Sequence, residues 1–254
     1  MARTATLRER SAGRLVEIAG YEHLRRSDDS QVRREKSKKT SEVMRKYNQK
    51  TSEQLFALKL AANFDRGDIV GCVTYDDAHL PQTRAEANTR FRCFRDRVRR
   101  EWTRRGLDPA QLVFAWSTEH VHGEGRWHHH FVCTAAGDDF KMLRKAWIYG
   151  SVDEFSALRV DTEKGYDSLA HYFAKEAREK LGLRSWSFSR NARKPVENIY
   201  LLESDTMVDP PPGVTVLERH VTETIFGKFF YLKYLMPYAK TKLPERRHSG
   251  GGQT

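Results

Sequence analysis

The chain has 254 residues, a formal net charge of +11 and a pI near 9.6; 39% of its residues are hydrophobic and 31% are charged. This length allows one large domain or two small ones with a sizeable core. The excess of positive charge favours a polyanion such as nucleic acid as partner, and a purely solubilising charge is the alternative. Three widely spaced cysteines without a Cys-x-x-Cys pair argue against a disulfide framework or a zinc ribbon.

The sequence contains no apolar run long enough to cross a bilayer. Its first fourteen residues are basic but lack the apolar core of a secretory signal. We therefore expect a cytoplasmic protein, in a bacterial host if the resemblance described below holds, with no membrane partner.

The N-terminal segment is polar and rich in charge. Residues 1–66 hold sixteen Lys and Arg against nine Asp and Glu. Residues 1–40 are expected to form an extended or partly disordered basic arm. A helix is predicted over residues 40–64, with Thr40 or Ser41 as its cap. Residues 1–66 are thus interpreted as a basic arm followed by an N-terminal helix.

The spacing of apolar residues between positions 67 and 183 alternates between the periods of strands and helices. The predicted elements are a strand at 67–77, a helix at 84–105, strands at 111–119 and 127–134, a helix at 138–147, a strand at 155–160 and a helix at 167–183. The order β-α-β-β-α-β-α predicts an α+β fold, an antiparallel sheet with helices packed on it, of the ferredoxin-like or RNA-recognition-motif type. We assign residues 67–200 to this core and residues 201–254 to a β-rich or mixed C-terminal appendix of unknown role.

Three consecutive histidines lie in the predicted strand 127–134. Successive side chains of a strand point to opposite faces, so His128 and His130 share one face and His129 lies on the other. Two imidazoles at this spacing can converge on one metal ion. The alternative is a surface strand with a chance cluster of histidines.

A carboxylate completes the same face. Glu119 ends the preceding strand, and a hairpin between the two strands can place it across from His128. Two imidazoles and one carboxylate form an open site that leaves positions for water or a phosphate oxygen.

The second chemical motif is a Tyr-x-x-Lys pair in the helix predicted at 167–183. Tyr172 and Lys175 are neighbours on one edge of a helix. A phenol with an ammonium group beside it can serve as a nucleophile. The alternative is a chance pair, with the tyrosine packed at the edge of the core and the lysine in water.

Four segments between residues 41 and 200 together resemble the HUH endonucleases, specifically the single-tyrosine rolling-circle replication initiators of phages, prophages and plasmids. They are "ANFDRGDIVGCVTYDDAHLP", "RWHHHFV", "LAHYFAKE" and "SWSFSRNARKP". The resemblance implies that His128, His130 and Glu119 bind a metal ion, that Tyr172 is the nucleophile and that Lys175 assists it. One departure is His129, where the family usually has a hydrophobic residue; strand alternation keeps it away from the metal.

The resemblance implies a metal-dependent DNA endonuclease and strand transferase that uses Mg²⁺ or Mn²⁺. Its expected partner is single-stranded DNA or a hairpin replication origin, with a host helicase or polymerase in addition. The enzyme would nick and rejoin DNA through a 5′-phosphotyrosine intermediate and so initiate rolling-circle replication. A single-tyrosine transposase or relaxase-like strand transferase is one alternative, and a binding module without catalysis is another.

Basic and aromatic side chains are expected to hold the DNA backbone and stack on its bases. The residues assigned to this role are Arg95, Arg99, Trp186 and Arg190. For the arginines, a solvated helix face is an equally weighted alternative.

Overall fold

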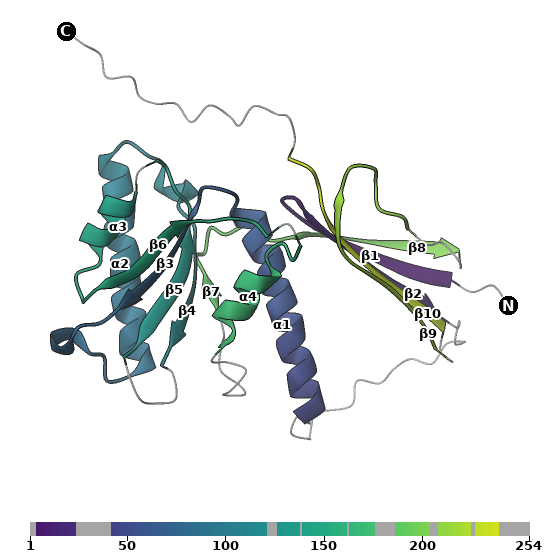
Figure 1. The fold of residues 1–254 in the computed structure, drawn as a ribbon, viewed down its shortest axis with the longest axis horizontal. Helices are drawn as coiled ribbons and strands as arrows, with labels where there is room; N and C mark the ends of the chain where they lie inside the picture. The colour runs from purple at the N-terminus through teal and green to yellow at the C-terminus, as the bar shows by residue number, and fades with distance from the viewer. Residues whose placement is uncertain are drawn as a thin grey trace, which may run out of the picture.

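The computed structural model of the protein describes residues 4–23, 42–120, 126–137, 139–161, 163–175, 186–203, 208–224 and 227–238. Within these residues the chain forms two antiparallel five-stranded sheets and four α-helices. Two of the helices lie between the sheets, and the other two cover the outer face of the first sheet (Figure 1). No helix in the described part of the chain has the length and apolar character needed to cross a membrane.

The first sheet has the strand order β6-β3-β5-β4-β7. Its strands are β3 (Ile69–Thr74), β4 (Phe114–Glu119), β5 (His128–Cys133), β6 (Val152–Ala157) and β7 (Ser187–Phe188). The helices of this region are α2 (Arg84–Arg104), α3 (Phe140–Ala146) and α4 (Asp167–Phe173). The element order is the predicted one, and the antiparallel order of β6-β3-β5-β4 is that of a ferredoxin-like sheet. The predicted α+β fold class is confirmed.

One face of this sheet is covered by α2 and α3. Thr83 caps α2 by accepting a hydrogen bond from the backbone N–H of Glu86. The apolar stripe of α2 recurs every three or four residues and is fully buried against the sheet. It comprises Ala87, Phe91, Phe94, Val98 and Trp102.

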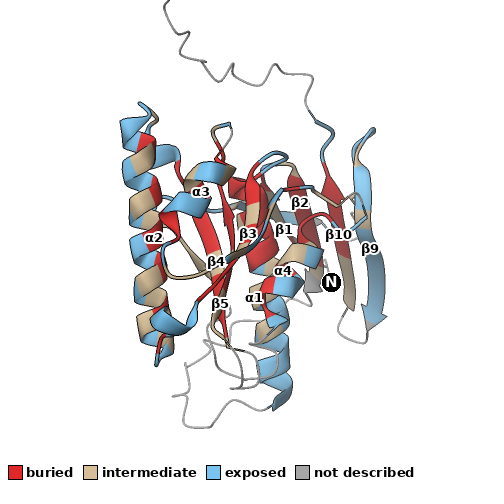
Figure 2. Cartoon of the chain, turned by 60° about the vertical axis from the view of Figure 1, so that its left-hand side comes forward, coloured by how far each residue is buried: buried red, intermediate tan, exposed pale blue. Residues whose placement is uncertain are grey.

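The opposite face packs against α1 (Glu42–Asn63) and α4. Only the C-terminal half of α1 contributes to this core, in which Phe56 contacts Phe173 of α4. The N-terminal half of α1 is mostly exposed (Figure 2). The face that carries the alternate side chains of β5, including His128 and His130, is therefore covered by helices only in part.

The second sheet has the order β8-β1-β2-β10-β9. Its strands are β1 (Thr4–Ala12), β2 (Leu15–His23), β8 (Val196–Glu203), β9 (Thr215–Thr224) and β10 (Gly227–Leu235). A two-residue turn joins β1 to β2 and lies so close to α1 that a Cβ on Gly13, whose φ is +55°, would sit 2.2 Å from the carbonyl oxygen of Ala61. Glycine is needed at this turn for both reasons.

The second sheet corrects the expectation of an N-terminal arm. Residues 4–23 form two paired strands with buried side chains instead of an extended tail. The remainder of the expected arm, residues 24–41, lies outside the described residues. Part of the C-terminal appendix, as β9 and β10, belongs to the same sheet, in which β10 pairs with β2.

Two predicted elements differ in their limits. The strand expected at 155–160 is observed at Val152–Ala157 as β6. The helix expected at 167–183 ends at Phe173 as α4, and residues 176–185 lie outside the described part of the chain. The predicted domain boundaries stay a prediction.

Candidate metal and nucleophile site

The β4–β5 hairpin aligns the three predicted metal ligands. Glu119 is the register partner of His128, and Ser117 is that of His130. His130 Nε2 lies 3.4 Å from Glu119 Oε2. The face-sharing inferred from strand alternation therefore places both histidines and the carboxylate on the same side of the sheet.

His129 points to the opposite face, as its place in the alternation requires. It is completely buried, with Nε2 2.8 Å from the Tyr75 hydroxyl and Nδ1 3.0 Å from the Thr118 hydroxyl. Its ring stacks on Phe91 of α2. Burial, together with the adjacent histidines, lowers the pKa of His129 to about 3. A histidine fits this core position because both ring nitrogens have a hydroxyl partner.

The Glu119 side chain carries an unmet requirement for a positive partner. Glu119 is only 4% exposed, and within the described residues its Oε1 is buried without a hydrogen-bond partner. A buried carboxylate oxygen without a donor is costly unless a cation neutralises it. With two imidazoles on the same face, the residues present fit a divalent metal ion.

His128 is oriented by residues of two neighbouring strands. Its Nδ1 lies 3.0 Å from the hydroxyl of Thr74 on β3, and that hydroxyl donates a hydrogen bond to Asp153 on β6. Because Thr74 donates to Asp153, it accepts from His128, which assigns the proton to Nδ1 and leaves the lone pair on Nε2. Burial is the main cause of a lowered pKa of His128, with His130 second, and this favours the neutral, metal-binding form.

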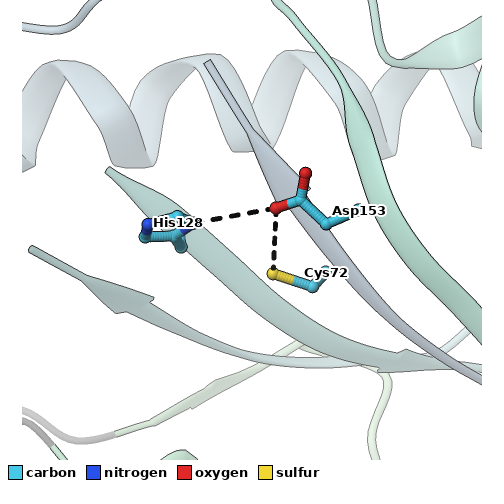
Figure 3. A group of neighbouring side chains, drawn as sticks. All are labelled: Cys72, His128 and Asp153. Carbon is cyan, nitrogen blue, oxygen red and sulfur yellow. Dashed lines mark hydrogen bonds and ion pairs between the residues drawn. The ribbon is translucent and has the colours of Figure 1, made fainter. Parts of the chain in front are cut away.

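A cysteine lies beside the same carboxylate. Cys72 Sγ is 3.8 Å from Asp153 Oδ2, and His128 Nδ1 is 3.8 Å from the same oxygen (Figure 3). Burial and the nearby Asp153 carboxylate raise the pKa of the Cys72 thiol to about 12. The sequence analysis did not single out Cys72, Thr74 or Asp153. Alternation along β3 could have placed Cys72 and Thr74 on the histidine face, whereas the position of Asp153 depends on pairing with a distant strand.

Tyr172 lies next to the metal-ligand face. Its ring makes an edge contact with His130, with the ring centroids 4.8 Å apart, and the residue is 50% exposed. Partial burial, followed by the nearby Cys72 and two glutamates, raises the pKa of its phenol. In contrast, Tyr166 is buried, and its hydroxyl donates to the carbonyl of Phe64. Tyr172 is therefore the better placed of the two to reach a ligand at the histidines.

Lys175 lies just after the end of α4 and is exposed. It lines a cavity of about 590 Å³ together with Tyr172 and three further lysines. These are Lys50, Lys164 and Lys233. The predicted nucleophile thus opens on a space with several ammonium groups, which suits a phosphodiester.

The predicted DNA-contacting arginines gather at a different place. Arg95, Arg99 and Arg190 line one cavity of about 420 Å³ beside β4 and β7. This cavity includes Trp116, whose ring lies 4.3 Å from the Arg95 guanidinium and belongs to the face covered by α2. The arginines therefore lie across the sheet from the histidines.

Trp186 is placed differently from the arginines. Its ring stacks on Phe56 at 5.0 Å, and its Nε1 donates to Ser52. One face of the indole is thereby occupied by the core, so base stacking is open only to the other face.

A comparison with known families identifies the segment that holds this site. Residues 68–180 match the family model of the replication-associated protein ORF2. The matched segment includes every predicted metal ligand and the Tyr-x-x-Lys pair. No curated protein and no solved structure matches the chain. The match confirms, at the level of the family, the resemblance to rolling-circle replication initiators, and it indicates a replication-associated role with DNA as the partner.

Proposed function

We propose, from the match of residues 68–180 to replication-associated proteins and from the site geometry, that the protein nicks and rejoins single-stranded DNA to initiate rolling-circle replication. The observation that carries this proposal is the contact between Tyr172 and His130 on the face that also holds Glu119 and His128. A binding module without catalysis has no need of a partly exposed phenol beside a metal-ligand set.

Glu119, His128 and His130 would hold a Mg²⁺ or Mn²⁺ ion. When bound, the ion supplies charge stabilisation to the scissile phosphate. Glu119 contributes the buried unpartnered oxygen, and the Thr74–Asp153 pair holds the His128 ring in the tautomer whose Nε2 can ligate.

In the proposed reaction, the Tyr172 oxygen attacks the phosphorus and the bond to the 3′ oxygen breaks. The phenol loses its proton, the departing 3′ oxygen gains one, and the DNA is left with a 5′-phosphotyrosine bond and a free 3′-OH. Because one phosphodiester replaces another, rejoining needs no ATP. The raised pKa of Tyr172 means that a nearby positive charge must offset the carboxylates, and Lys175 lines the cavity in which this is needed.

The same chemistry would serve a strand transferase of a mobile element. The family match to replication-associated proteins favours initiation.

The proposal is tested by incubating the full chain with a labelled single-stranded DNA library and Mn²⁺. Covalent adducts are then detected on a denaturing gel. We expect an adduct in the wild type, none with EDTA, and none in Tyr172→Phe, which removes the nucleophile but neither the basic surface nor the fold. Tyr200→Phe, which removes an exposed phenol on β8, is the matched control and should form the adduct. An adduct formed by Tyr172→Phe would assign the nucleophile to another residue.

A further inference from the structure

Cys72, His128 and Asp153 bring one ligand atom each to within 4.8 Å of one another. These three residues come from the adjacent strands β3, β5 and β6 (Figure 3). In tetrahedral zinc sites with bond lengths of about 2.0–2.3 Å, neighbouring ligand atoms are about 3.5 Å apart. The two distances of 3.8 Å to Asp153 Oδ2 are close to that spacing.

We propose that Cys72, His128 and Asp153 form a second metal site, specific for a thiophilic ion such as Zn²⁺. A thiolate, an imidazole and a carboxylate suit zinc, whereas Mg²⁺ and Mn²⁺ prefer oxygen ligands and gain little from sulfur. Three protein ligands leave the fourth position to water. This ligand set differs from the Glu119, His128 and His130 set, because it contains a thiolate and approaches His128 from the side of Nδ1.

The two sites exclude each other through the His128 ring. A neutral imidazole has one lone pair, on either Nδ1 or Nε2. The tautomer held by Thr74 carries its proton on Nδ1 and offers Nε2 to the Glu119 side. Zinc on Nδ1 requires the other tautomer, which puts the proton on Nε2 and removes a ligand from the first site. This consequence rests on the proposed function: zinc would inhibit nicking by withdrawing His128.

Metal binding is tested without reference to DNA by titrating the full-chain protein with Co²⁺, which replaces zinc and gives a near-ultraviolet thiolate-to-metal charge-transfer band. We expect the band in the wild type, its removal by Zn²⁺, and its loss in Cys72→Ser. Cys93→Ser is the matched control, since Cys93 is an exposed cysteine on α2, and it should retain the band. Circular dichroism verifies that both variants fold.

Affinity gives a second measurement. Zn²⁺ competition against a chromophoric chelator should show a loss in Cys72→Ser larger than the roughly 10–100-fold that removal of an outer-shell partner causes. A band that persists in Cys72→Ser, or one that disappears in Cys93→Ser, overturns the site.

Inhibition is measured separately with Mn²⁺-dependent nicking. Cys72→Ser should nick like the wild type and should need at least tenfold more Zn²⁺ for half inhibition. Equal sensitivity of the two proteins overturns the coupling through His128. A wild type without nicking activity contradicts the proposed function and leaves the cobalt result unaffected.

Discussion

The histidine triplet illustrates how neighbouring residues of one type acquire opposite roles. His128 and His130 lie on a partly open face beside carboxylates, whereas His129 is enclosed by aromatic rings and hydroxyls on the other face. Strand alternation predicted this division from the sequence. The structure adds its cause, a polar pocket formed by Tyr75 and Thr118 that accepts a neutral ring in an otherwise apolar core.

The buried His129 makes folding stability sensitive to acid. Its pKa falls from an ordinary value of 6.5 to about 3 in the folded protein, so the unfolded chain binds the proton more readily. This stabilising contribution is fully present above pH 6.5 and is lost progressively as the pH falls towards 3. We expect it to amount to a few kcal/mol on the order of magnitude.

The measurement is the free energy of unfolding by urea between pH 7 and 4, in EDTA so that metal release does not contribute. His129→Leu should show a smaller decrease across this range. At pH 7 it should cost about 1–3 kcal/mol, because Tyr75 and Thr118 keep second partners at Ala87 and Asn88. It should still form the DNA adduct, since His129 faces away from the metal ligands. Parallel pH profiles for the two proteins would contradict this account.

At the scale of elements, a ladder of buried charges joins the second sheet to the nucleophile helix. Arg10, Glu17 and Lys233 are register partners on three adjacent strands, and Arg10 and Lys233 each form an ion pair with Glu17. Lys233 Nζ also binds both carboxylate oxygens of Asp167, in the first turn of α4, at 2.6 and 2.7 Å. Tyr172 is therefore held by a helix that is fastened at its start to β10.

Lys233→Met should destabilise the protein by about 3–5 kcal/mol, because the charge of Glu17 is left buried with a single partner. Urea unfolding measures this loss. The double variant Lys233→Met with Glu17→Gln removes both buried charges and should recover part of the stability. Adduct formation should be slower in the single variant, since α4 loses its fastening. Unchanged stability in Lys233→Met would show that the ladder contributes nothing.

The same ladder explains which elements were predictable from the sequence. The strands and helices between residues 69 and 173 follow apolar periods, and local hairpin pairing places Glu119 beside His128. In β1 and β2, charged residues face the interior as ion pairs, so their sequence resembles that of a polar arm. Asp153 was also unpredictable, because it approaches Cys72 through long-range pairing of β3 with β6, whose register shifts after Cys72.

At the scale of the whole molecule, the strands β1 and β2 change the meaning of the N-terminal charge. Residues 4–23 pair with β8 and β10 and bury Ala12 and Leu15 against α1. Deletion of residues 1–40 would remove two inner strands of the second sheet. The contribution of positive charge to DNA binding therefore has to be examined on surface side chains instead of by truncation.

The arginine cavity beside β4 and β7 is the surface where such a contribution is expected. Arg92, Arg95, Arg99 and Arg190 line it with Asp96 as the sole acidic lining residue in the described part of the chain. Burial, and the like charges of Arg99 and Arg92, lower the pKa of Arg95, and its Nε is buried without a partner within the described residues. Clustered guanidinium groups with so little compensation are typical of an anion-binding surface.

Arg99→Gln and Arg190→Gln should each flatten the salt dependence of DNA binding. Each phosphate contact to single-stranded DNA adds about 0.7 to the slope of log K against log salt, because it releases condensed counterions. The measurement is fluorescence anisotropy with a labelled random single-stranded DNA at several salt concentrations. Arg219→Gln, on β9 and paired with Asp209, is the matched control and should leave the slope unchanged. If both cavity variants keep the wild-type slope, these arginines form a solvated helix face, and the DNA path must follow the lysines near Tyr172 instead.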